Sequence, residues 1–466
     1  MKKFLYVLFV LSVVFNIDLK AEKLFGWGGN LDGQLGDGTT TPRKSPVQIG
    51  SETNWSQIAC GYDHSIAIKS DGTLWAWGYN YWGQLGDSII SESNTPVQVG
   101  SEINWSKVAC GNGHSLAIKS DGTLWAWGNN FFGQLGDGTT TIRRSSVQIG
   151  SDKNWSQVVC GERHSIAIKN DGTLWAWGRN VNGELGDGTQ TIRKSPVQIS
   201  SETNWSQVAC GDWYSIAIKS DGTLWAWGDN GYGQLGDGTT DGKTSPEQIG
   251  NEANWSYVSA GGEHSLAMKK DGSLWAWGRN YEGQLGVGTI KVCTSPIQID
   301  SQAKWLQIAA GSSHSIAIKD DGTLWVWGFN ESGQLGDGTT TDRKIPVQIG
   351  SEASWSQVAC GSDFSFGLKT LIDNVEDSRA EKFNFNASPN PFFDEVNIEF
   401  NLPASNKVSL QVYDLSGSEI STLFEGSLDV GTHKYTLEGT NLASGEYTVI
   451  LTIGKERFAR KVIRVK

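Results

Sequence analysis

Short segments with alternating apolar and polar residues recur along most of the chain. In the unit at 108–136, the segments VACG (108–111), HSLAIK (114–119) and LWAWG (124–128) each have the length of a short strand. An Asp-Gly pair separates the last two segments and is a strong β-hairpin signal, and QLG (134–136) begins a fourth segment. Because no long segment shows helical periodicity, the pattern predicts an all-β chain built from four-stranded antiparallel units.

The unit repeats every 50 residues. The signature Cys/Ala-Gly-x-x-(His/Tyr/Phe)-Ser begins at residues 60, 110, 160, 210, 260, 310 and 360, without insertion or deletion. Four short strands at this period are typical of one propeller blade. The seven signatures therefore predict seven blades.

The first and last units each contain only half a blade. The segment LFGWG (24–28) lacks a front half, and SFGLK (365–369) lacks a back half. We predict that these halves pair, with Lys23 close to Lys369, because such closure removes exposed sheet edges. The predicted fold class is thus an all-β, seven-bladed β-propeller closed by its N-terminal and C-terminal half-blades and followed by a small β-sandwich domain.

Tryptophan supports the propeller prediction. Of the 22 Trp residues, all but Trp82 and Trp213 follow the repeat. Residues two apart on a strand share a face, so Trp125 and Trp127 point one way and Ala126 points the other way. We expect the bulky face of one blade to pack against the small-residue face of the next.

The ends of the chain differ from the repeats. Residues 1–21 combine a basic start, a 14-residue apolar run and a small residue at the end, which are the marks of a secretory signal peptide. The predicted propeller covers 22–369, a polar linker covers 370–383, and 384–466 shows the alternation of a small β-sandwich. We therefore expect the mature protein to leave the cytoplasm.

The repeat unit CGxxHSxAIKxDGTLWAWGxNxxGQLGDGT resembles the regulator-of-chromosome-condensation repeat over roughly 23–369. The founder of that family is a guanine-nucleotide exchange factor, and bacterial propellers of this fold include secreted inhibitors that hold a protein against one face. The resemblance thus implies a seven-bladed propeller, with either partner binding or exchange activity.

The tail resembles a second family. Its segments SPNPF (388–392), VYDLSG (412–417) and LASGEYTV (442–449) are similar to the C-terminal sorting domain of type IX secretion cargo. This resemblance implies that 384–466 binds the type IX secretion machinery. It also implies a protein that is secreted or attached to the outer surface of a Gram-negative bacterium.

Charge argues against nucleic-acid binding. The chain has a net charge of −12, and residues 22–369 carry 25 basic and 35 acidic residues, or −10. Binding to phosphate backbones is driven by counterion release at basic surfaces. We therefore expect no nucleic-acid partner.

Two repeat positions hold chemically active side chains. One holds His in five blades, with Tyr214 and Phe364 in the other two, and the other alternates Cys with Ala. Because Phe cannot bind a metal ion, we expect the imidazoles to bond backbone groups. The Cys side chains are expected as small buried groups, with the possibility of a disulfide left open. No nucleotide-binding motif is present, so we expect neither an enzyme nor a metal or cofactor site.

Departures from the repeat supply the candidate binding residues. Since successive hairpins alternate ends, the turns after CG and after WG should share one propeller face. Aromatic and Arg residues in these turns match the composition of protein-binding hot spots. The candidates for partner binding are Tyr79, Tyr81, Trp82, Phe131, Phe132, Arg179, Trp213, Tyr232, Arg279 and Tyr281.

The first five of these candidates come from neighbouring blades, and we expect them to form one patch. Ordinary solvent-exposed turns are the alternative interpretation, and aromatic stacking on a carbohydrate is a second one. We expect a monomer that binds a macromolecule, with a protein favoured over a carbohydrate.

Overall fold

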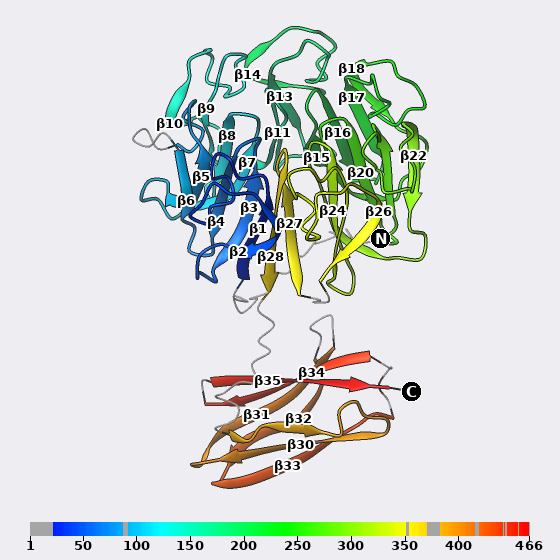
Figure 1. Ribbon diagram of the computed structural model, residues 1–466. Coiled ribbons are helices and arrows are strands. Elements are labelled where there is room, and N and C mark those ends of the chain that lie inside the picture. Colours follow the sequence, from blue (N-terminus) through cyan, green and yellow to red (C-terminus); the bar gives the residue numbers. More distant parts are fainter. Residues whose placement is uncertain are drawn as a thin grey trace, which may run out of the picture. The chain divides into compact units, whose positions relative to one another are not determined.

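The computed structural model describes residues 22–86, 92–350, 354–370, 383–414, 419–440, 442, 445–454 and 456–465. The predicted signal peptide, residues 1–21, lies outside the described residues, as does most of the predicted linker. The chain forms two compact units, Met1–Leu371 and Ile372–Lys466 (Figure 1). No helix in the described ranges has the length and apolar character needed to cross a membrane.

Six four-stranded antiparallel sheets are continuous in sequence. Blade 1 contains β3 (Trp55–Cys60), β4 (His64–Lys69), β5 (Leu74–Tyr79) and β6 (Glu92–Gln98), and blade 2 contains β7 (Trp105–Cys110), β8 (His114–Lys119), β9 (Leu124–Gly128) and β10 (Arg143–Gln148). Blade 3 contains β11 (Trp155–Cys160), β12 (His164–Lys169), β13 (Leu174–Gly178) and β14 (Arg193–Gln198), and blade 4 contains β15 (Trp205–Cys210), β16 (Tyr214–Lys219), β17 (Leu224–Gly228) and β18 (Lys243–Gln248). Blade 5 contains β19 (Trp255–Ala260), β20 (His264–Lys269), β21 (Leu274–Gly278) and β22 (Cys293–Ile299), and blade 6 contains β23 (Trp305–Ala310), β24 (His314–Lys319), β25 (Leu324–Gly328) and β26 (Arg343–Ile349).

Blade 7 is assembled from both ends of the propeller. It contains β27 (Trp355–Cys360), β28 (Phe364–Thr370), β1 (Glu22–Gly28) and β2 (Arg43–Gln48), in the order β2-β1-β28-β27. Strands β1 and β28 pair antiparallel, with Lys23 opposite Lys369 and Trp27 opposite Ser365. The predicted closure by two half-blades is confirmed.

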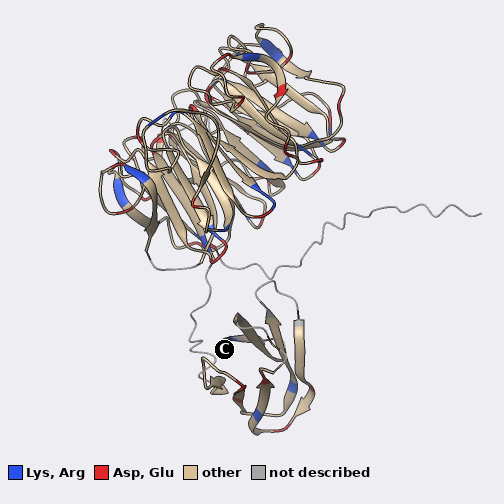
Figure 2. Cartoon of the chain, turned by 90° about the vertical axis from the view of Figure 1, so that its right-hand side faces the viewer, with Lys and Arg blue, Asp and Glu red and all other residues tan. Residues whose placement is uncertain are grey.

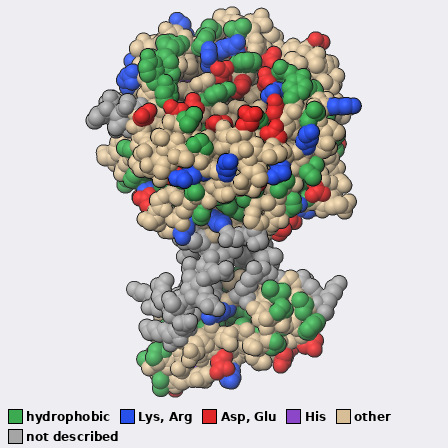
Figure 3. Space-filling view, in the orientation of Figure 1, with side chains coloured by type: hydrophobic (Ala, Val, Ile, Leu, Met, Phe, Trp, Pro, Cys, Tyr) green, Lys and Arg blue, Asp and Glu red, His purple; other side chains and the backbone are tan. Residues whose placement is uncertain are grey.

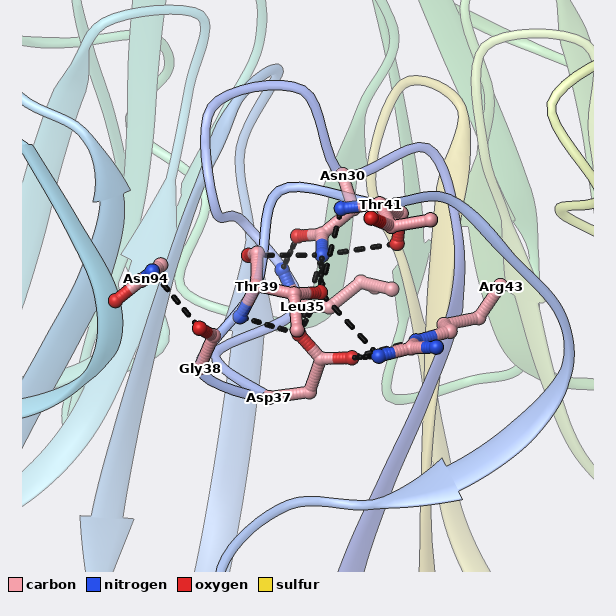
Figure 4. Close-up of polar contacts among 8 residues, drawn as sticks. All are labelled: Asn30, Leu35, Asp37, Gly38, Thr39, Thr41, Arg43 and Asn94. Carbon is pink, nitrogen blue, oxygen red and sulfur yellow. Dashed lines mark hydrogen bonds and ion pairs between the residues drawn. The ribbon is translucent and has the colours of Figure 1, made fainter.

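The prediction for the fourth strand of each blade was wrong. In blade 2, residues 134–136 lie in a turn, and the outer strand is β10. The intervening loop is held by its own polar groups, as the equivalent loop of blade 7 shows (Figure 4). There Asn30 Nδ2 donates to Asp37 Oδ1 at 3.2 Å, and Arg43 forms an ion pair with the same carboxylate at 2.6 Å. These side chains support an extended loop where apolar alternation ends.

Apolar layers between blades form the propeller core. The layer between blades 1 and 2 places Ile66, Leu74 and Ala76 against Trp105 and Trp127. Charged residues lie mostly in loops and at strand ends, which leaves the sheet faces to apolar contacts (Figure 2). The expected packing of a bulky face against a small-residue face is therefore present.

A main-chain carbonyl of each blade binds two side chains of the next blade. Gln84 O in blade 1 accepts from Trp127 Nε1 at 2.8 Å and from Ser115 Oγ at 2.8 Å, and both donors are fully buried in blade 2. The same pair of bonds recurs at each of the seven boundaries. The carbonyls belong to Gln34, Gln84, Gln134, Glu184, Gln234, Gln284 and Gln334. We call this arrangement the carbonyl latch.

The histidines bond to the next blade rather than to backbone groups, which corrects our expectation. His64 Nε2 lies 3.0 Å from Ser115 Oγ, and four further His–Ser pairs repeat this contact. Because the Ser115 hydroxyl donates to the latch, its oxygen accepts from the imidazole. Burial in an apolar layer lowers the pKa of each of the five imidazoles to about 3.

A lysine lies between two tryptophans at the Asp-Gly end of each of blades 1 to 6. In blade 1, Lys69 Nζ lies 3.5 Å from the Trp75 ring centroid and 4.8 Å from that of Trp55. Its ammonium group also forms an ion pair with Glu52 at 2.5 Å. Trp75-type residues, which we had assigned to apolar packing, thus cover a buried cation.

The C-terminal unit is a two-sheet sandwich. One sheet contains β29 (Asn386–Ser388), β30 (Glu395–Leu402) and β33 (Gly431–Glu438), and the other contains β31 (Asn406–Asp414), β32 (Glu419–Leu428), β34 (Gly445–Ile453) and β35 (Glu456–Arg464). Ile398 of the first sheet and Leu410 and Val449 of the second belong to one buried cluster. The predicted sandwich is confirmed.

Replacement of one latch serine tests the boundary between blades 1 and 2. Ser115→Ala removes a donor from Gln84 O and leaves buried His64 Nε2 without its partner. We expect a loss of about 1–3 kcal/mol in the free energy of unfolding, measured by denaturant titration. Ser120→Ala in an exposed turn is the matched control, and equal effects of the two changes would contradict the latch.

Replacement of one buried histidine tests how the histidines affect the pH dependence of stability. Since an unfolded imidazole takes up a proton near pH 6.5, each buried neutral His stabilises the fold above that pH, and its contribution is lost as the pH falls toward 3. Phe364 occupies the same repeat position as His314, and its ring lies over Gly361 as the imidazole lies over Gly311. We therefore expect His314→Phe to reduce the fall in Tm between pH 6.5 and pH 4, and a pH profile parallel to that of the wild type would disprove this role.

Candidate binding face

Two sets of turns emerge at one end of the propeller. In blade 1, the turn between β3 and β4 is bonded to the turn after β5, because Tyr79 N donates to Asp63 O at 2.8 Å. In blade 3, Arg179 N donates to Arg163 O at 2.9 Å in the same way. The surface formed by these turns is called the binding face below.

The aromatic candidates of blades 1 and 2 form a continuous cluster on the binding face. The ring centroids of Tyr79 and Tyr81 are 6.3 Å apart, those of Tyr81 and Trp82 are 4.6 Å apart, and Trp82 lies 5.1 Å from Phe131 across the blade boundary. Tyr81 is 59% exposed and Phe131 is 53% exposed. These four residues are called the aromatic cluster.

Phe132 contributes to a different contact. Its ring lies 5.2 Å from the guanidinium carbon of Arg163 in blade 3. This contact links Phe132 to blade 3. Tyr79, Tyr81, Trp82 and Phe131 are joined by ring contacts, whereas Phe132 pairs with the next blade.

The remaining candidates form two smaller groups. Arg179 lies over the Trp213 ring at 5.7 Å, and its guanidinium forms an ion pair with buried Glu184 at 2.6 Å. In the next two blades, Tyr232 and Tyr281 are 6.0 Å apart, and Arg279 lies 5.4 Å from the Tyr281 ring. All the candidates named from the sequence thus lie on the binding face, in separate clusters.

A hollow opens at the propeller axis on this face. Each blade contributes three consecutive residues to its wall, beginning at the repeat position of Cys60. The cysteines at this position in five blades, and Cys293 elsewhere, are free thiols. Burial raises the pKa of the five thiols in the hollow. They are partly exposed groups of the wall, whereas the exchange with Ala predicted buried ones.

Acidic side chains gather in and around the axial hollow, a feature that our sequence analysis missed. Figure 3 shows them within a depression of the propeller surface, with hydrophobic side chains farther out. Glu162 and Asp212 line the hollow, and the acidic residues of the two turns in several blades also include Asp32, Asp63, Asp229, Glu263 and Asp363. The signal was available, because Glu162 and Asp212 follow the CG pair where other blades have Tyr, Asn, Gly or Ser.

Burial and mutual repulsion disfavour the charged forms of Asp212 and Asp63. Burial, with Glu162 and Glu263 nearby, raises the pKa of Asp212 to about 7. Burial, with Asp32 and Asp363 nearby, raises the pKa of Asp63 to about 6. The hollow and its rim therefore hold closely spaced carboxyl groups, of which Glu162 and Glu263 have an arginine partner.

Each arginine of the binding face already has an acidic partner. Arg163 pairs with Glu162 at 3.1 Å, and Arg279 pairs with Glu282 at 2.7 Å and Glu263 at 3.5 Å. Within the part of the chain that the structure describes, no group of three or more His, Cys, Asp or Glu residues is arranged to hold a metal ion. The face thus offers aromatic surface and unneutralised carboxylates.

Family comparisons cover both units of the chain. A family model described as the RCC1-like domain matches residues 11–211 and 193–367. A second model, described as a secretion system C-terminal sorting domain, matches residues 386–466. The two matches correspond to the propeller and the sandwich.

Solved structures share the propeller fold. Human WBSCR16 is 24% identical, with a TM-score of 0.68, over 76% of this chain and 100% of that chain. Prp20p from Saccharomyces cerevisiae, crystallised in work on its binding to Gsp1p and histones, is 24% identical, with a TM-score of 0.69, over 78% of this chain and 95% of that chain. A structure of yeast RCC1 (Prp20) bound to Kap60 has the same identity and TM-score, over 78% and 92%. At this identity the similarity shows the fold alone.

Neutralisation of Asp212 tests the electrostatics of the hollow. Because the pKa of Asp212 is raised in the folded protein, the free energy of unfolding falls as the pH rises from about 4 to about 7. Above that range the decrease is complete. We expect Asp212→Asn to raise Tm by roughly 2 °C at pH 8 and to have little effect at pH 4. Asp320→Asn in an Asp-Gly turn is the control. A similar Tm change at both pH values would contradict this account.

Proposed function

Because the chain belongs to the RCC1-like domain family and carries a secretion sorting domain, we propose that it is an exported, non-enzymatic module that binds another protein through the binding face. The sorting domain marks the chain for secretion or cell-surface attachment through the type IX machinery. Fold alone does not assign a partner, so the proposal rests on the site.

The aromatic cluster carries the proposal. Tyr81 and Phe131 are more than half exposed although the scaffold buries its Trp77-type and Trp55-type residues in the inter-blade layers. Aromatic side chains exposed together at a rigid surface are typical of binding hot spots, because they bury large areas with little loss of conformational freedom. Their position in turns that depart from the repeat supports a role other than packing.

The turns that carry the cluster are held in place by hydrogen bonds. Trp82 N donates to Gln84 Oε1 at 3.0 Å, and Phe132 N donates to Gln134 Oε1 at 2.9 Å. Phe131 N donates to Asn129 Oδ1 at 3.0 Å. A preorganised surface loses less entropy on binding, which favours a protein interface.

The ring geometry favours a protein over a carbohydrate. Trp82 has Tyr81 on one side at an interplanar angle of 89° and Phe131 on another at 80°. Such edge-to-face neighbours occupy the surroundings of the largest ring, whereas stacking on a sugar needs an open, flat face. Exchange activity on a cytoplasmic GTPase would also be separated from its partner by export.

Truncation of two exposed rings tests the proposal. The full chain, immobilised, is exposed to proteins of the culture medium and cell surface, and captured proteins are quantified by mass spectrometry. We expect Tyr81→Ala with Phe131→Ala to reduce capture of the main partner at least tenfold, because hot-spot truncation commonly costs more than about 1.4 kcal/mol.

The control variant combines Val181→Ala with Leu306→Ala. Val181 occupies the repeat position of Tyr81 in blade 3, and Leu306 lies near the opposite end of β23. Both side chains are at least half exposed, so the variant loses comparable apolar surface. Equal capture by the wild type and the Tyr81/Phe131 variant would remove the aromatic cluster as the binding site.

A further inference from the structure

We propose that the bound protein presents a cationic segment, whose Lys or Arg side chains enter the axial hollow while adjacent residues contact the aromatic cluster. This inference rests on the proposed function and specifies the chemistry of its partner. It follows from three features of the described residues, which are the balance of charge, the position of the rings and the occupants of similar sites within the propeller.

The binding face has a large acidic excess. The three-residue turns that begin with the Gly of the CG or AG pair and the five-residue turns after the WG pair contain nine acidic and three basic residues, a balance of −6. All three arginines are already bound to acidic side chains. In the described part of the chain, Asp32, Asp63, Asp212 and Asp363 form no ion pair.

Two acidic groups come from different blades: Glu162 and Asp212 line the hollow, and Asp63 and Asp363 directly follow the wall residues Tyr62 and Ser362. Asp63 is close enough to Asp32 and Asp363 to repel both charges. Asp212 is similarly close to Glu162 and Glu263, and it accepts a hydrogen bond from Tyr62 at 3.4 Å. A cation placed between such carboxylates relieves repulsion as well as gaining attraction, so the hollow favours positive ligands.

The aromatic cluster borders one of these acidic groups. Tyr79 N donates to Asp63 O at 2.8 Å, and Tyr79 begins the ring series that reaches Phe131. An ammonium or guanidinium group at this border would contact an aromatic ring and a carboxylate together. Each contact is favourable, and partial burial strengthens both.

The propeller itself already binds cations in this way. Lys69 lies over Trp75 while its ammonium group pairs with Glu52. Arg279 lies over Tyr281 while its guanidinium pairs with Glu263. The border of Tyr79, Asp32 and Asp63 offers the same combination of ring and carboxylate, without a cation of its own among the described residues.

Other occupants fit the charge less well. A second copy of the propeller, with its net charge of −10, would bring like charge to the hollow. An anionic polymer would be repelled for the same reason. A neutral carbohydrate would donate hydroxyl hydrogen bonds to these carboxylates but would leave their mutual repulsion in place.

Fluorescence anisotropy with defined probes tests the inference on the full chain. The probes are a labelled 12-residue peptide of alternating Arg and Gly, the same peptide with Glu in place of Arg, and a labelled cellohexaose. We expect the Arg peptide alone to bind, with an affinity that falls as salt is raised from 50 to 300 mM. Equal binding of the Glu peptide or preferential binding of the sugar would overturn the inference.

Charge-neutral variants locate the site. Asp63→Asn with Asp363→Asn keeps side-chain shape and should weaken binding of the Arg peptide about tenfold, since two close charge contacts are lost. The control, Asp241→Asn with Asp320→Asn, removes two exposed charges elsewhere and should stay within about twofold of the wild type. Equal weakening by both pairs, or by neither, would overturn the inference. Melting curves confirm that each variant is folded, and Asp212→Asn provides an independent site variant.

The two proposals can fail separately. If the Arg peptide does not bind but the Tyr81/Phe131 variant still loses its captured protein, the cationic segment is disproved and the binding face stands. If the captured protein is unaffected by the loss of Tyr81 and Phe131 while the Arg peptide depends on Asp63, the aromatic cluster is disproved as the protein-binding site, and with it the proposed contact of the cationic segment.

Discussion

The carbonyl latch is the constraint on which the propeller depends. Gln84 O receives both Trp127 Nε1 and Ser115 Oγ, and the same hydrogen bonds recur at every boundary, including the one between blades 6 and 7. Because the donors are fully buried, loss of the acceptor would leave unsatisfied polar groups in an apolar layer. The latch fixes the position of each blade relative to the next. Apolar side chains fill the layer between the two blades.

This division of labour leaves the turns free to vary. Trp127-type and Ser115-type residues make the buried inter-blade contacts, while the side chains that follow the CG and WG pairs contact one another at the surface. The binding face therefore acquired its rings and carboxylates without disturbing the ring of blades. Blade 5 shows the same freedom on its outer strand, where Val287 and Cys293 replace the Asp37–Arg43 ion pair and pack with apolar neighbours.

The sequence predicted the fold well because the 50-residue period and the two half-blades depend on local patterns. It predicted the outer strands poorly, since residues 134–136 are apolar enough for a strand but are held in a turn by Asn130. The partners of the histidines were missed because His64 and Ser115 are 51 residues apart, and their contact depends on the offset between blades. The aromatic residues of the binding face are visible as departures from the repeat, whereas the acidic ones are spread over the turns of different blades and come to one face only in the closed ring of blades.

Site-specific photocrosslinking tests the central claim most directly. A photoreactive phenylalanine analogue replaces Phe131 in one variant and Leu306, near the opposite end of a blade, in a second variant. Each full chain is irradiated together with extracellular proteins of the organism that produces it. The account predicts crosslinks from position 131 to one main protein, through peptides that carry clustered Lys or Arg. Crosslinks that form equally from position 306, or that map to acidic peptides, would contradict it.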